Sequence, residues 1–201
     1  MKASLFTTLL FLCFAALCLS ACSLNPGGTD GGHELFDKVC PAGEALELCK
    51  NDDVVVIEDM RCTSGREVWD AFYRTTQAGK KASVLCAHYY TIDKEHMSEE
   101  LYEEEKDKYP ALYFMLVKYD GKRYTVTTRD CSLETPEPSQ SYKYLMHYTG
   151  SAPTPYAVYS TYDRYVLTDS SGYSWEDIER GMYSSRLGDY IRHCSVYTDL
   201  E

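Results

Sequence analysis

The stretch YFMLVKYDGKRYTVTT, residues 113–128, decides the fold class of this chain. Aromatic and β-branched side chains, which favour strands, flank an Asp-Gly dipeptide at 120–121. Asp-Gly between two such runs is typical of a β-hairpin with a two-residue turn. That turn would place Tyr119 opposite Lys122. The sequence therefore predicts a pair of antiparallel strands as the centre of the fold.

Alternation along this hairpin predicts which of its faces is buried, because successive strand side chains point to opposite sides. The face predicted to be buried carries Tyr113, Met115, Val117, Tyr119, Tyr124 and Val126. The opposite face carries Lys118, Arg123, Thr125 and Thr127, although Phe114 and Leu116 also lie on it, and it is predicted to contact water near the turn.

Further strands and helices are predicted on both sides of the hairpin. Short apolar runs, many rich in tyrosine, predict strands at about 53–58, 82–92, 142–148, 156–167 and 191–197. Helices are predicted at about 65–78, from 98 to Pro110, and from 174 to a point before Gly188. This order favours the α+β class: a twisted, mainly antiparallel sheet with two to three helices packed on one face.

Capping signals mark the ends of these helices. Ser64 followed by Glu67 fits a capping box at the start of the first helix, and Gly79 is suited to end it. Ser98 and Ser174 are the expected N-caps of the other two.

The acidic helix after Ser98 is predicted to rest on the body of the domain through Leu101 and Tyr102. Its glutamates lack the alternating Asp/Asn ligands and the turn glycine of a calcium loop. They are therefore interpreted as a solvated helix face.

The first residues have the pattern of a bacterial export signal. Lys2 supplies a positive charge, and the apolar run from Leu5 to Leu19 has the length of a signal-peptide core but not of a membrane-spanning helix. Leu19-Ser20-Ala21-Cys22 resembles the lipobox of bacterial lipoproteins, whose cysteine receives a diacylglycerol and becomes the new N-terminus. An ordinary signal peptide with an incidental cysteine, or an uncleaved anchor, is the alternative.

These signals divide the chain into three parts. Residues 1–21 are predicted to be a lipoprotein signal peptide, with Cys22 as the site of lipid attachment. Residues 22–33 are rich in glycine and read as a flexible tether. Residues 34–201 have the size of a single α+β extracytoplasmic domain. The predicted location is the extracytoplasmic face of the cell membrane, held there by the lipid.

The charge of the chain excludes one class of partner. Loss of Lys2 with the signal peptide leaves 19 basic and 31 acidic residues, a net charge of −12. Such an acidic surface is repelled by nucleic acid and by anionic lipid head groups. Nucleic-acid binding is not expected, and membrane attachment is predicted to depend on the lipid.

The cysteines suggest disulfides more than a metal site. Six follow Cys22 in the mature chain: Cys40, Cys49, Cys62, Cys86, Cys131 and Cys194. An even number in an exported domain is typical of disulfide bonding, although the sequence does not choose among the 15 pairings of six cysteines. Cys40 and Cys49 are the one pair close enough in sequence to suggest a bond between them. The close ligand pairs of a zinc site are missing from the sequence, so no metal or other cofactor is predicted.

The sequence carries no recognisable catalytic motif, and tyrosine is its one unusual feature, at 19 residues. Exposed tyrosine rings are common at binding surfaces, because they offer a stacking face and a hydroxyl at little entropic cost. The tyrosines predicted to form such a surface are Tyr142, Tyr144, Tyr148, Tyr156, Tyr159, Tyr162 and Tyr165. The alternative is that they are structural, because tyrosine is also a good strand former.

Several segments together resemble a family of small lipoproteins from Gram-positive, often gut-dwelling, bacteria whose domain has no assigned function. The segments are Arg61–Gly65, Trp69–Phe72, His88–Thr91, Leu116–Gly121, Tyr142–Tyr148, Tyr162–Tyr173 and Trp175–Ser185. The resemblance covers about residues 53–199. It implies attachment to the cell envelope and transfers no catalytic residues.

Two functions follow as hypotheses. The first is a non-enzymatic envelope domain that binds another surface component, whether glycan, peptide or protein. The second is a small extracellular hydrolase whose acid and base are carboxylates. Exposed aromatic side chains in one patch would favour binding, and a pocket with two converging carboxylates would favour the enzyme.

Overall fold

The computed structural model describes residues 31–152, 154 and 157–201 and confirms the α+β class. Its α-helices are α2 (Gly31–Asp37), α3 (Ala42–Lys50), α4 (Arg66–Gln77), α5 (Glu99–Glu105) and α6 (Trp175–Tyr183). Short 3-10 turns lie at η1 (Lys94–His96), η2 (Lys106–Lys108) and η3 (Leu187–Asp189). Among these described helices, none is long and apolar enough to cross a membrane.

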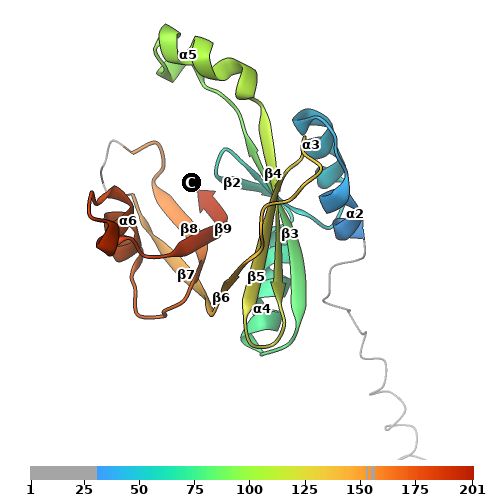
Figure 1. The fold of residues 1–201 in the computed structure, drawn as a ribbon, viewed down its shortest axis with the longest axis vertical. Coiled ribbons are helices and arrows are strands. Elements are labelled where there is room, and N and C mark those ends of the chain that lie inside the picture. Colours follow the sequence, from blue (N-terminus) through green and yellow to red (C-terminus); the bar gives the residue numbers. More distant parts are fainter. Residues whose placement is uncertain (1–30, 153, 155–156) are drawn as a thin grey trace, which may run out of the picture.

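The strands form two sheets instead of the one predicted (Figure 1). Six strands pair in the order β2-β1-β3-β4-β5-β6, and three in the order β7-β8-β9. Their bounds are β1 (Val55–Glu58), β2 (Arg61–Ser64), β3 (Ala82–Tyr90), β4 (Ala111–Tyr119), β5 (Tyr124–Asp130), β6 (Gln140–Tyr142), β7 (Tyr144–Ser151), β8 (Thr161–Thr168) and β9 (His193–Leu200). β1 and β3 are parallel, and the other pairs are antiparallel.

The hairpin that decides the fold class is present, but its turn is longer than predicted. Tyr119 lies opposite Tyr124, not opposite Lys122, so residues 120–123 form the loop. The Asp120 carboxylate accepts hydrogen bonds from the backbone N–H groups of Lys122 at 2.7 Å and Arg123 at 2.8 Å. This side-chain capping favours the longer loop. The register differs by two residues, so each side chain keeps its predicted face.

Both faces of the six-stranded sheet are covered, whereas the sequence predicted helices on one. α2 and α3 cover one face, where Phe114 and Leu116 of β4 are buried. α4 and the three-stranded sheet cover the other, where Val117 and Val126 are buried. The predicted inner face is not buried along its whole length, because Tyr113 at its end remains exposed.

The capping box predicted from Ser64 and Glu67 does not form at the start of α4. Ser64 ends β2 opposite Val56, and the N-cap is Gly65, which makes no side-chain capping bond. Gly65 has a φ of 75°, and a Cβ there would lie 2.3 Å from the carbonyl oxygen of Val54. This close packing requires glycine. The predicted end of the helix is confirmed, since Gly79 has a φ of 72° and donates to Thr76.

The two later helices start at their predicted caps. The hydroxyl of Ser98 accepts from the backbone of Leu101 at 3.3 Å, and Ser174 and Asp177 form a complete capping box. α5, however, projects away from the sheets with Leu101 exposed, so the prediction that this residue holds it to the body is wrong (Figure 1).

Candidate functional site

The structure does not bring the seven predicted tyrosines into one exposed patch. Tyr142 and Tyr165 are buried in the core, at 1% and 6% exposure. The rings of Tyr148 and Tyr162 lie 6.2 Å and 6.5 Å from the ring of Trp175. Tyr144 and Tyr159 are partly exposed on separate elements, and Tyr156 lies outside the described residues. The first two are structural residues, because a ligand cannot reach them.

Exposed apolar side chains gather instead around α6 and η3. We name Tyr173, Met182, Tyr183, Leu187 and Tyr190 the α6–η3 surface. Tyr183 is 83% exposed and Leu187 is 96% exposed. Single exposed apolar residues are ordinary on proteins, but several within one short segment mark an interaction surface.

An open hollow of about 1000 Å³ lies within this surface, between α6 and the turn that follows it. Tyr173 and Tyr183 contribute rings to its lining, and Asp177, Arg180 and Asp189 contribute charged groups. Aromatic rings beside a few polar groups are the usual composition of a ligand site.

The local sequence explains how this hollow is built. Trp175 and Ile178 on the inner side of α6 pack with Val166 of β8 and fix the helix on the three-stranded sheet. Gly181 lies under the chain that returns across the helix, and a Cβ there would be 2.5 Å from the carbonyl oxygen of Asp189. Glycine at this helical position therefore lets η3 approach and form the opposite side of the hollow.

The carboxylates in the hollow already have hydrogen-bond partners. Asp177 accepts from the backbone and the hydroxyl of Ser174 at 3.0 Å and 2.9 Å, and Asp189 accepts from Ser184 at 2.6 Å. Hydrogen bonds from Ser174 lower the pKa of Asp177 below its ordinary value. Asp177 is therefore ionised near neutral pH, whereas a general acid needs a raised pKa.

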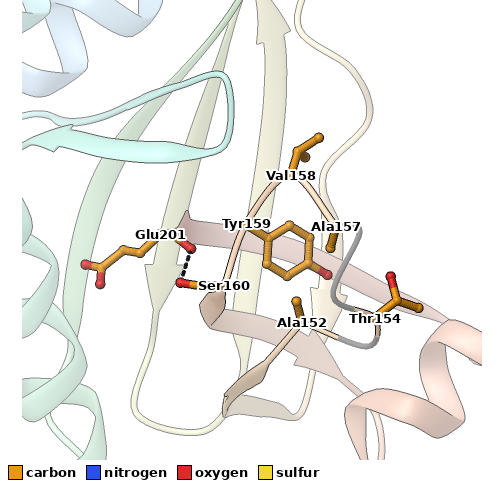
Figure 2. A pocket seen from close by; sticks show the side chains of 7 residues that line it. All are labelled: Ala152, Thr154, Ala157, Val158, Tyr159, Ser160 and Glu201. Atoms are coloured by element: carbon orange, nitrogen blue, oxygen red, sulfur yellow. Dashed lines mark hydrogen bonds between the residues drawn. The ribbon is translucent and has the colours of Figure 1, made fainter.

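A second, smaller hollow of about 620 Å³ lies beside the loop between β7 and β8 (Figure 2). Of the predicted tyrosines, Tyr159 lines it. Its carboxylate-bearing residue is Glu201, whose backbone oxygen accepts from the Ser160 hydroxyl at 2.9 Å. Figure 2 shows the Glu201 side chain directed away from the Tyr159 ring. This hollow thus presents one ring and little charge.

Two carboxylates do converge elsewhere, on the guanidinium of Arg66. Asp163 lies 3.6 Å from it, and Asp199 is hydrogen-bonded to it. Asp199 also accepts from the backbone of Cys62 at 3.0 Å, and Asp163 accepts from His147 at 2.7 Å. These contacts join α4 and β2 to the three-stranded sheet. We interpret the group as an ion-pair network that holds the two halves of the fold together.

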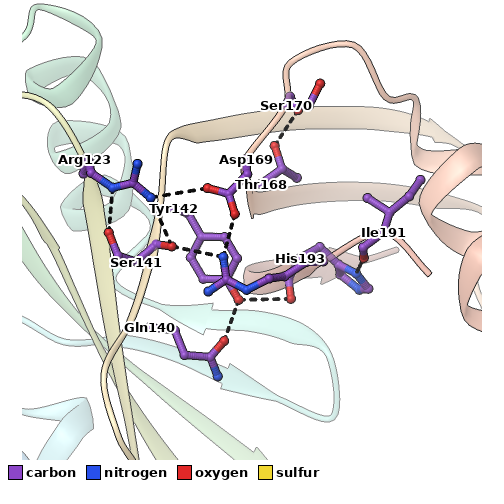
Figure 3. A network of polar contacts seen from close by, with 10 residues as sticks. Arg123, Gln140, Ser141, Tyr142, Thr168, Asp169, Ser170, Ile191 and His193 are labelled. Carbon is purple, nitrogen blue, oxygen red and sulfur yellow. Dashed lines mark hydrogen bonds and ion pairs between the residues drawn. The ribbon is translucent and has the colours of Figure 1, made fainter. Parts of the chain in front are cut away.

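A similar network joins the sheets where the chain passes from β6 to β7 (Figure 3). The Asp169 carboxylate lies 3.4 Å from Arg123 and 2.5 Å from Arg192. The Tyr142 hydroxyl donates to Gln140 at 2.8 Å. The predicted single strand 142–148 is therefore split between two sheets, and Tyr142 has a structural role.

The cysteines are all free thiols among the described residues, and Cys40, Cys49, Cys86 and Cys131 are buried. Within the same residues, no group of three or more histidine, cysteine or acidic side chains is placed to hold a metal ion. The predicted disulfides remain predictions, and Cys22 lies outside the described residues.

No protein-family model matches this chain, and no curated protein or solved structure has significant similarity to it. The site is therefore defined by its geometry alone. Its key tyrosine could have been found from helical spacing, because Glu176, Arg180 and Tyr183 repeat at intervals of four and three residues. An aromatic residue on that polar face is the signal that the sequence analysis missed.

Proposed function

We propose that this chain is a lipid-anchored extracytoplasmic protein whose domain binds another component of the cell envelope and is not an enzyme. The α6–η3 surface carries the binding part of the proposal, because it exposes three tyrosines, a leucine and a methionine in one short segment, and two of these tyrosines line one hollow. The lipobox-like sequence that ends at Cys22 supports the anchor and the location.

The composition of the hollow favours a ligand with both apolar faces and polar edges, such as a glycan or a peptide. Tyrosine rings offer flat surfaces for stacking, and Arg180 and Asp189 offer a donor and an acceptor at the rim. The tether predicted at residues 22–33 would let the domain reach such a ligand near the membrane.

The hollow gives less support to a hydrolase. Its two aspartates are held by serine hydroxyls, and the lowered pKa of Asp177 opposes proton donation at neutral pH. We therefore place binding first.

A thermal-shift screen of residues 31–201 against cell-wall glycans and peptides tests the proposal. A ligand that binds only the folded domain must raise its Tm. Tyr183→Ser should abolish the shift, because it removes the most exposed ring of the hollow. Tyr113→Ser is the matched control, since Tyr113 is also an exposed tyrosine but belongs to β4 in the six-stranded sheet and does not line the hollow. Equal loss of the shift in both variants, or no shift with either ligand class, would contradict the proposal.

A further inference from the structure

Three of the buried thiols lie in one place. Cys40, Cys49 and Cys131 belong to the apolar cluster between the sheet and the helices α2 and α3. Cys40 precedes α3, Cys49 lies near its end, and Cys131 follows β5. Residues that are far apart in the sequence thus bring three oxidisable groups together.

Backbone geometry selects one pair among the three. The backbone N–H of Cys40 donates to the carbonyl oxygen of Cys131 at 3.0 Å. This hydrogen bond places the two backbones side by side, as a disulfide requires, since its Cα atoms lie roughly 4.4–6.8 Å apart.

Cys49 is placed less well for bonding to Cys40. Cys49 lies within α3, and its backbone takes part in the hydrogen bonds of the helix and of the turn that ends it. Among the described residues, no backbone hydrogen bond like that between Cys40 and Cys131 joins Cys49 to either cysteine.

The same junction is held by a buried arginine. Arg129, at the end of β5, is 1% exposed and donates to the backbone carbonyls of Phe36, Lys38 and Leu133. Its guanidinium also lies 5.6 Å from the centre of the Phe36 ring. The segment before Cys40 and the segment around Cys131 are therefore held against each other with or without a covalent bond.

We propose that Cys40 and Cys131 form a disulfide that fastens residues 31–50 to the six-stranded sheet, while Cys49 stays a thiol. The proposal rests on the proposed location outside the cytoplasm, where thiols are oxidised, and is independent of the ligand. Since α2 begins within the last residues of the predicted tether, the bond would lie between the lipid anchor and the domain core.

The reaction is thiol–disulfide exchange with the disulfide of an envelope oxidoreductase. The Cys40 thiolate attacks that disulfide, releases one thiolate and forms a mixed disulfide; the Cys131 thiolate then attacks the Cys40 sulfur and releases the second. Two thiols lose their protons, and the oxidoreductase gains two electrons. Cys40 reacts first because it is 8% exposed, against 1% for Cys131.

Burial also separates the three thiols in reactivity. It raises the pKa of Cys131 to about 11 and that of Cys49 to about 12. Few thiolates form at such sites near neutral pH. In the mixed disulfide, the backbone hydrogen bond between Cys40 and Cys131 holds Cys131 beside the residue whose sulfur it attacks.

Mass spectrometry of the full chain tests the pairing. The chain is isolated from membranes with its thiols blocked and digested without reductant, and a reduced sample is reoxidised with glutathione disulfide. The expected result is a peptide with Cys40 linked to one with Cys131, and an alkylated Cys49. A bond to Cys49, or three free thiols in both samples, overturns the pairing. If the thiols are free in the membrane sample but the Cys40–Cys131 bond forms on reoxidation, the chain does not meet an oxidising environment in the cell. That result would overturn the proposal by contradicting the location outside the cytoplasm.

Melting temperatures provide a second test. Closing a loop of about 90 residues should place the Tm of the oxidised chain on the order of 10 °C above that of the reduced chain. Cys40→Ala should remove this difference, and Cys49→Ala should retain it. Each variant is measured in its oxidised and its reduced form. A substitution that only lowers the stability lowers both Tm values and leaves their difference unchanged. An unchanged difference in Cys40→Ala would overturn the proposal.

Discussion

The Nε2 atom of His88 lies 3.3 Å from the carbonyl oxygen of Val196, and this contact joins β3 of the six-stranded sheet to β9 of the three-stranded sheet. The imidazole is 6% exposed. Burial lowers the pKa of His88 to about 4, because the charged form loses its hydration. The interface between the sheets therefore holds this histidine in its neutral form.

This buried histidine predicts a loss of stability in mild acid. The unfolded chain binds a proton near pH 6.5, whereas the folded chain does so near pH 4. The stability that neutral His88 contributes to the folded state is therefore complete above pH 6.5. It is lost as the pH falls towards 4, by about 3 kcal/mol in total. His88→Gln should flatten the dependence of the unfolding free energy on pH in this window. His96→Gln is the control, because His96 is exposed; an equal flattening there would contradict the assignment.

Gly181→Ala should destabilise the domain and disturb the hollow. Alanine is the better helix former, but its Cβ would lie 2.5 Å from the Asp189 carbonyl, a backbone atom that cannot rotate away. We expect a loss of about 1–3 kcal/mol in urea unfolding. Gly43→Ala in α3 is the matched control, since a Cβ there meets nothing within 4 Å. Stabilisation by both changes would show that η3 does not rest on α6.

The elements that the sequence predicted well are those with local causes. Ser98 and Ser174 cap their helices because a hydroxyl reaches the backbone three residues ahead. The β4–β5 hairpin follows from its strand-forming residues, and only its loop length differed. Gly65, by contrast, caps α4 because Val54 approaches it, a contact that no local pattern reveals.

The candidate site was less predictable for the same reason. The division of residues 142–148 between two sheets buries Tyr142, and packing against α4 buries Tyr165. Tyrosine content alone does not distinguish such positions from Tyr183, which is exposed because the opposite side of α6 is the one that packs. Exposure depends on which elements meet, and that is decided by tertiary contacts.

Arg129→Met should weaken the attachment of the first two helices. The substitution keeps much of the apolar stem but leaves the carbonyls of Phe36, Lys38 and Leu133 without their donor. We expect a loss of about 3 kcal/mol in urea unfolding. Arg123→Met is the control from the same hairpin, because Arg123 is half exposed and its ion pair should contribute about 1 kcal/mol or less. Equal losses in both variants would contradict this role of Arg129.

Cys22→Ala should remove the lipid and leave the fold intact, because Cys22 precedes every element of the described structure. With a net charge of −12 after loss of the signal peptide, the chain has little attraction to anionic membranes, so a variant cleaved by another peptidase should appear in the medium. Cys18→Ala, within the predicted signal peptide, should stay in the membrane fraction. Fractionation with N-terminal sequencing distinguishes cleavage from retention. A cleaved Cys22→Ala chain that remains membrane-bound would show that the lipid is not the sole anchor.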